Sequence, residues 1–284
     1  MIKREGFPSR AGAGLTLFSQ PERCGMLPIS GDQPPTTADQ FARALHEGLG
    51  QHGVKATVVA EGEWPRLRSL GIKLLQSSGS RPLPRLQAEE SLTIGSVAIT
   101  GHPVEIEGVP AELDVAFSEL RAGLASSPGE GWQIVPLGAA SGSVVLEVQR
   151  DQLEAALHRV ISQLAGKHGV TVKATRLELS APTPRSVAFA VICTAKMFIA
   201  SATLTVRGTA EIDQELNARL GNLAVTGDGV VATMAQGFVQ PHINEWNGKV
   251  IPLASYVAGG LALHDVKITV GTTVRVEASL GATA

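Results

Sequence analysis

The pattern of apolar residues predicts that a helix followed by a strand opens the folded part of the chain, over residues 37–60. The apolar positions of the helix recur at the spacing of one helix face: Phe41, Ala44, Leu45 and Leu49. Gly53 closes this segment, and residues 54–60 have the character of a strand. Residues 1–36 show no sustained periodicity and end at the breaker Pro34-Pro35, so we expect a loosely ordered N-terminal arm.

The same order of elements returns over residues 151–179. Its apolar stripe is stronger and consists of Leu153, Leu157, Ile161 and Leu164. In both segments an Ala-Leu-His sequence leads to a His-Gly pair and then to a strand, which suggests an internal duplication of 37–60 and 151–179 within one domain, 37–284. The His-Gly pairs suit helix C-termini, where His lies in the last turn and Gly adopts the left-handed cap, so they do not require a metal.

Alternation with period two predicts half-buried antiparallel strands between and after these helices. The alternating apolar positions are Val97 and Ile99; Val104 and Ile106; Leu113, Val115 and Phe117; and Val144, Leu146 and Val148. Residues 186–207 contain no Gly, Pro, Asn or Asp and are too long for one ordinary strand, so we expect a hairpin that turns near residues 196–198. Its apolar face is predicted to carry Val187, Phe189, Val191, Cys193 and Met197.

The C-terminal segment predicts a second hairpin, and its register follows from the side-chain pattern. A three-residue loop over 271–273 pairs apolar with apolar residues, whereas a two-residue turn would pair Val270 with the polar Thr273. The predicted pairs are Val270 with Val274, Ile268 with Val276 and Val266 with Ala278. The opposite face of this hairpin is polar, so the sheet is expected to be covered on one side only.

A third helical stripe precedes this hairpin, within residues 229–246. It consists of Val231, Met234, Ala235, Phe238 and Val239. Pro241 interrupts the stripe and should kink the helix or divide it in two, because proline removes a backbone donor and clashes with the preceding turn.

Composition narrows the possible functions. The chain has 284 residues, of which 44% are hydrophobic and 18% charged, and a formal net charge of -2, which argues against nucleic acid as a partner. Cys24 and Cys193 form neither a disulfide framework nor a zinc site, and Cys193 is interpreted as a small buried apolar residue. The N-terminal residues lack the apolar core of a secretory signal, and Lys196 argues against a membrane span in the longest apolar stretch. We therefore expect a cytoplasmic protein that associates at most peripherally with a membrane.

Motifs for catalysis are weak. Residues 227–232 match G-x-G-x-x-A, but no acidic residue ends a following strand, as a dinucleotide site requires, so a simple turn is favoured. His242 and Glu245 have a spacing that could hold a metal, without the accompanying ligands. No nucleophile elbow or phosphate-binding loop is present. The sequence therefore predicts a protein that is not an enzyme and that has no cofactor and no metal.

Several segments carry a resemblance to a known family. They are Trp64-Pro65-Arg66-Leu67, residues 92–110, residues 143–153, Asp213-Gln214-Glu215-Leu216-Asn217 and the Gly227-Asp228-Gly229 turn before a helix. Over residues 37–280 the chain resembles bacterial TULIP-like (tubular lipid-binding) proteins, a group that includes a mycobacterial phospholipid-binding protein of lipomannan elongation. The resemblance implies an α+β fold, in which a strongly curved antiparallel sheet wraps around long amphipathic helices and leaves a lipid-sized apolar tunnel. The missing signal peptide and the N-terminal arm depart from that pattern.

The resulting expectation is a non-catalytic carrier that binds a lipid or another long apolar ligand between helix and sheet. The predicted ligand-binding residues are Phe189, Val191, Met197, Val231, Met234 and Phe238. Transient contact with a membrane surface and self-association through the arm are the other expected interactions. Two alternatives remain: an assembly protein with a dry core whose arm docks on a partner, and an NAD(P)-dependent oxidoreductase centred on Gly227 and Gly229.

Overall fold

The computed structural model describes residues 27–31, 33–77, 86–106, 108–127, 131–167, 169–197, 200–227, 230–257 and 260–282. The elements of its first half are β1 (Leu27–Ile29), α1 (Ala38–Gln51), β2 (Val54–Glu63), β3 (Arg66–Ser77), β4 (Glu90–Ile106), β5 (Val109–Ser127), β6 (Gly131–Gly138) and β7 (Ser141–Gln149). The second half contains α2 (Arg150–Gly166), β8 (Thr171–Thr183), β9 (Ser186–Met197), β10 (Ala200–Ile212), β11 (Asn217–Gly227), α3 (Val230–Trp246), β12 (Val250–Pro252), the 3-10 helix η2 (Leu253–Tyr256), β13 (Leu261–Val270) and β14 (Thr273–Ala282).

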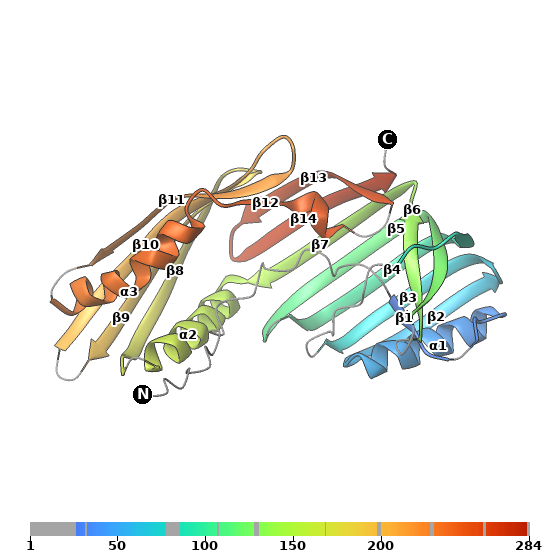
Figure 1. Ribbon diagram of the computed structural model, residues 1–284, viewed down its shortest axis with the longest axis horizontal. Helices are drawn as coiled ribbons and strands as arrows, with labels where there is room; N and C mark the ends of the chain where they lie inside the picture. The colour runs from blue at the N-terminus through green and yellow to red at the C-terminus, as the bar shows by residue number, and fades with distance from the viewer. Residues whose placement is uncertain are drawn as a thin grey trace, which may run out of the picture.

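The strands form two separate sheets, which lie at opposite sides of Figure 1. The nine-stranded sheet has the order β13-β14-β7-β5-β4-β3-β2, and β6 and β1 extend from β5. The five-stranded sheet has the order β12-β11-β10-β9-β8. The first sheet is therefore built from both ends of the described chain, and the second from its middle. All described strand pairs are antiparallel except β3 with β4.

The expected fold class, a curved antiparallel sheet wrapped around long amphipathic helices, is wrong. The described part of the chain is mostly β, with 65% strand and 20% helix, and its three α-helices are short. The helices have 14, 17 and 17 residues, which gives lengths of about 21 to 26 Å at about 1.5 Å per residue. Strand β5 has 19 residues and spans about 60 Å at about 3.3 Å per residue. No described helix is long enough to fill a sheet of such strands from end to end.

Several local predictions are confirmed. Helices α1 and α2 occupy the predicted segments, and each is followed by a glycine with positive φ, Gly53 at 77° and Gly169 at 70°. The hairpin over 186–207 turns after Met197, which pairs with Ala200. The C-terminal hairpin has the predicted register, in which Val270 lies opposite Val274. The other two predicted pairs, Ile268 with Val276 and Val266 with Ala278, are also present. Helix α3 continues through Pro241, so of the two predicted effects of this proline the division of the helix is wrong, and the kink stays a prediction.

The N-terminal arm is described only from Leu27 onward. Strand β1 pairs with β6 and buries Ile29, a contact that the sequence did not predict. Residues 1–26, which include Phe7, Leu15, Leu17 and Phe18, lie outside the described residues. The predicted arm-mediated self-association therefore stays a prediction.

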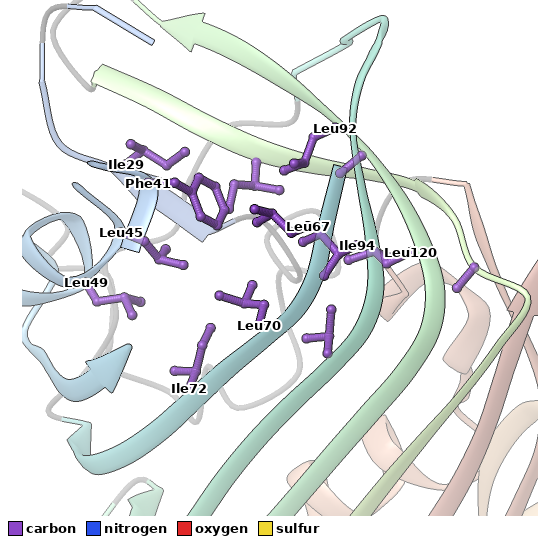
Figure 2. Packing of buried hydrophobic residues seen from close by; sticks show 14 of the residues in the cluster. Ile29, Phe41, Leu45, Leu49, Leu67, Leu70, Ile72, Leu92, Ile94 and Leu120 are labelled. Atoms are coloured by element: carbon purple, nitrogen blue, oxygen red, sulfur yellow. The ribbon is translucent and has the colours of Figure 1, made fainter. Parts of the chain in front are cut away.

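The hydrophobic core lies between α1 and the nine-stranded sheet (Figure 2). Thr37 starts the helix by accepting a hydrogen bond from the Gln40 amide at 3.2 Å, and the side chains of Phe41, Leu45 and Leu49 then fall on the buried face. The Phe41 ring contacts Trp64, with 5.3 Å between ring centroids. This half of the molecule therefore has the close-packed interior expected of a stable domain.

The two sheets meet where the β8–β9 turn touches β13. The Ile268 amide donates a hydrogen bond to the Pro184 carbonyl at 2.7 Å, and the Arg185 guanidinium contacts the Asp265 carboxylate at 2.6 Å. The hydrogen bond from Arg185 lowers the pKa of Asp265 below its ordinary value. This junction is polar and joins the edge of one sheet to the tip of a hairpin of the other.

None of the described helices is both long and apolar enough to cross a bilayer.

Candidate functional site

The predicted ligand-binding residues lie in the five-stranded sheet and in α3. Phe189 and Val191 lie on β9 and are half-buried. Met197 is the last residue of β9, and Val231, Met234 and Phe238 belong to α3, but the side chains of these four residues lie outside the described part of the structure. The predicted opposition of the α3 stripe and the β9 strand therefore stays a prediction.

One side of the five-stranded sheet is apolar, and we name it the β9 face. It consists of Leu177, Leu179, Phe189, Val191, Leu204 and Val206. In the strand register Val191 lies between Leu177 and Val206, Phe189 lies opposite Leu179, and Leu204 lies opposite Cys193 on the same side of the sheet. Gly208 lies opposite Phe189, and a Cβ there would lie 2.7 Å from the Phe189 ring and 2.4 Å from Leu223. The absence of a side chain at Gly208 thus lets Phe189 and Leu223 come together on this face.

Helix α2 attaches to the edge strand β8 of this sheet through polar groups. The Arg150 guanidinium donates to the Leu177 carbonyl at 2.9 Å, and the Glu154 carboxylate accepts from the Leu177 amide at 2.7 Å. His158 Nδ1 lies 3.0 Å from Thr175 Oγ1. These contacts satisfy backbone groups that an edge strand would otherwise leave free, and they hold α2 beside the β9 face.

The apolar stripe of α2 is not buried, in contrast to that of α1. No residue of α2 is buried, whereas α1 buries Phe41, Leu45, Gly48 and Leu49. Val160 and Leu164 remain 37% and 38% exposed. The core cluster contains no described residue between 150 and 256. The unit formed by α2 and the five-stranded sheet thus keeps apolar side chains partly open to solvent, which is unusual unless something covers them.

A second apolar surface, the β7 face, lies on the nine-stranded sheet next to the core cluster, since its Val115 pairs with Ile99, which packs against that cluster. It consists of Leu113, Val115, Val144, Leu146, Val276 and Ile268, which register in two rows across β5, β7, β14 and β13. All six side chains are half-buried, and none belongs to the core cluster. The opposite side of the same strands carries Arg275, whose guanidinium bonds Glu277 at 2.7 Å and Glu147 at 3.1 Å. Only one side of this part of the sheet is therefore apolar.

Helix α2 lies between the two sheets and touches both (Figure 1). Besides its contacts with β8, its Arg159 guanidinium donates to the Gly108 carbonyl in the turn between β4 and β5, at 2.5 Å. Helix α2, with its partly exposed apolar stripe, therefore contacts both sheets.

A thiol, a hydroxyl and an imidazole meet under α2, an arrangement that the sequence did not reveal. Cys193 lies opposite Thr175 and bonds its side chain, and Thr175 in turn contacts His158, whose Nε2 lies 3.5 Å from Ser162 Oγ. Cys193 is half-buried rather than fully buried. Burial raises the pKa of its thiol, against a smaller opposing effect of the Thr175 hydrogen bond. A thiol that is held protonated is a poor nucleophile, so the arrangement favours packing over catalysis.

We expect Cys193 to react slowly with an alkylating reagent. In a Cys24→Ser background, the rate at pH 8 should be below that of a free cysteine thiol, because the raised pKa leaves less thiolate at that pH. The rate should also keep rising as the pH passes the ordinary thiol value. Mass spectrometry after timed quenching measures it. A rate at pH 8 above that of free cysteine would contradict the raised pKa.

A recess of about 510 Å³ lies elsewhere, on the nine-stranded sheet. Its lining includes the apolar Leu67, Ile94 and Ala139 and the charged Glu119 and Arg121. Glu119 has a left-handed backbone, with φ of 48°, and Arg121 lies 3.6 Å from Glu90. This recess could not be predicted from the sequence, because a left-handed residue inside a strand does not change the hydrophobic periodicity.

The dinucleotide motif falls between β11 and α3. Strand β12, which follows α3, pairs antiparallel with β11. This connection is not the parallel β–α–β unit that a dinucleotide-binding turn requires. Asp228 and Gly229 lie outside the described residues, as does the side chain of His242. Within the described part of the chain, no group of three or more His, Cys, Asp or Glu residues could hold a metal.

Comparison with protein-family models, with curated proteins and with solved structures finds no match to this chain.

Proposed function

We propose that the protein binds the acyl chain of a lipid, or another long apolar ligand, and carries it without catalysing a reaction. The observation that carries this proposal is the β9 face beside α2, where a regular apolar surface and an apolar helix stripe meet without forming a closed core. Covering such surfaces would remove apolar area from water, at about 25 cal/mol per Å². The resemblance to TULIP-like proteins points in the same direction.

The chemistry of the two faces suits an acyl chain better than a polar ligand. Their side chains are Leu, Val, Ile and Phe, which offer broad contact without hydrogen-bond donors or acceptors. A flexible chain needs contact area more than directional bonds, and neither face presents a charged residue among its defining members. We expect the ligand to reach the protein from a membrane surface, which the protein contacts transiently.

Binding should be lost when a charge is placed on the β9 face. For Val191→Glu we expect at least about a tenfold weaker affinity for a fluorescent fatty acid, because the carboxylate would have to be desolvated against the chain. The matched control is Ile192→Glu, since Ile192 is also half-buried on β9 but points to the opposite side of the sheet. Titration in solution, without vesicles, measures both variants.

The control should bind as the unchanged protein does. Equal loss of affinity in Val191→Glu and Ile192→Glu would argue that the charge acts through stability and not through the β9 face. If the unchanged chain shows no saturable binding, the proposed function is wrong.

A further inference from the structure

One end of the five-stranded sheet gathers positive charge. Here α2 ends, β8 begins, β9 ends and β10 begins, at the side of the sheet away from the nine-stranded sheet (lower left of Figure 1). Thr171 on β8 pairs with Lys196 on β9, and the Val170 amide donates to the Ala165 carbonyl, which fixes the end of α2 beside the start of β8. Three exposed lysines therefore share this end: Lys167, Lys173 and Lys196.

The described segments that form this end of the sheet contain no acidic residue. Residues 160–173, 194–203, 226–227 and 230–233 contain no Asp or Glu in the sequence, and none of the three lysines forms an ion pair with a described residue. Asp228 lies outside the described residues. In a protein with a net charge of -2, a lysine cluster of this kind is a local feature and does not follow from overall composition.

Exposed apolar side chains of α2 lie near the same end of the five-stranded sheet. Val160, Leu164 and Lys167 follow one another at i, i+4 and i+7 along one stripe of α2. Val160 and Leu164 are more than a third exposed, and Leu164 lies one turn before Lys167. Aliphatic side chains next to lysines are the combination that binds the interface of a bilayer, where the chains enter the headgroup region and the ammonium groups meet lipid phosphates.

We propose that this end of the protein, carried by Lys167, Lys173 and Lys196 with Val160 and Leu164, docks on a membrane surface rich in anionic phospholipids. This proposal rests on the proposed function, because it names the membrane surface from which the bound ligand would come. Docking there would bring the partly exposed side chains of α2 next to the bilayer, so that an acyl chain could pass to the β9 face with little exposure to water.

The test is flotation of the full chain with two kinds of vesicle, phosphatidylcholine alone and an equal mixture of phosphatidylcholine and phosphatidylglycerol. We expect binding to the mixed vesicles only, weakened by added salt. The combined variant Lys167→Glu, Lys173→Glu and Lys196→Glu should bind them at least about 100-fold more weakly, because each lysine near an anionic surface contributes about fivefold and each glutamate is repelled. The control is Arg43→Glu, Lys55→Glu and Lys73→Glu, three exposed cations on α1, β2 and β3 with the same change in charge.

The outcomes separate this proposal from the proposed function. The control should float as the unchanged protein does, and the lysine variant should still bind a fluorescent fatty acid in solution. Equal binding to both vesicles, no binding to either, or equal loss in the control would overturn the docking surface. Flotation that follows the prediction in a chain that takes up no fatty acid would leave the docking surface standing and overturn the proposed function.

Discussion

Leu45→Ala should lower the free energy of unfolding by about 2 to 5 kcal/mol, the usual cost of a cavity in a closed core. Leu45 is fully buried on α1, among Phe41, Leu49 and the strands of the nine-stranded sheet. The matched change is Leu157→Ala, which removes the same side chain from the same Ala-Leu-His context in α2. Leu157 is half-buried, so its loss should cost about 1 kcal/mol or less.

Urea unfolding followed by tryptophan fluorescence and circular dichroism measures this pair of variants. Trp64 and Trp132 pack against the core cluster and report on the first sheet, while Trp246 in α3 reports on the second. The two leucines should therefore differ by severalfold in their effect. A loss for Leu157→Ala as large as that for Leu45→Ala would show a dry core under α2 and would remove the main support for a ligand surface there.

Gln133→Met should raise the free energy of unfolding by about 1 to 3 kcal/mol, the cost of burying an amide without hydrogen bonds. Gln133 lies on β6 between Pro28 and Ala125, and its side chain is fully buried. Within the described part of the chain, neither its Nε2 nor its Oε1 has a hydrogen-bond partner. Methionine has nearly the same shape and leaves no polar atom to satisfy.

Gln76→Met is the control for this substitution, because Gln76 is exposed on β3 and its replacement should change stability by less than about 0.5 kcal/mol. Thermal and urea unfolding of both variants give the comparison. If Gln133→Met is less stable than the unchanged protein, the buried amide takes part in bonding that stabilises β6.

Local structure could be predicted from the sequence because it depends on near neighbours. The spacing of Phe41, Leu45 and Leu49 locates α1, and the alternation around residues 271–273 determines the register of β13 with β14. The division into two sheets could not be predicted in this way. The strand order depends on the pairing of β14 with the distant β7 and on the parallel pairing of β3 with β4. Periodicity shows which side of a strand is apolar, but it does not show which strand pairs with it.

The same limit explains the outcome for the candidate site. The apolar positions of β9 could be predicted, and Phe189 and Val191 do lie on one side of the five-stranded sheet. The stripes of α1 and α2 look alike in sequence, yet that of α1 is buried and that of α2 is only half-buried, because burial depends on what packs against a helix. The alternation of Val144, Leu146 and Val148 predicted an apolar side of β7. Its continuation onto β14 and β13 could not be predicted, because it depends on the order of the strands in the sheet.

Photoaffinity labelling with a diazirine-bearing fatty acid tests the central claim most directly, because it reports both binding and place. After irradiation of the full chain and digestion, mass spectrometry should find adducts on peptides that carry the α2 stripe and the β9 face, around Leu157 and Val191, and these adducts should be competed away by unlabelled fatty acid. Val191→Glu should reduce them and Ile192→Glu should not. Adducts that resist competition, or that gather only at the recess near Arg121, would contradict the account.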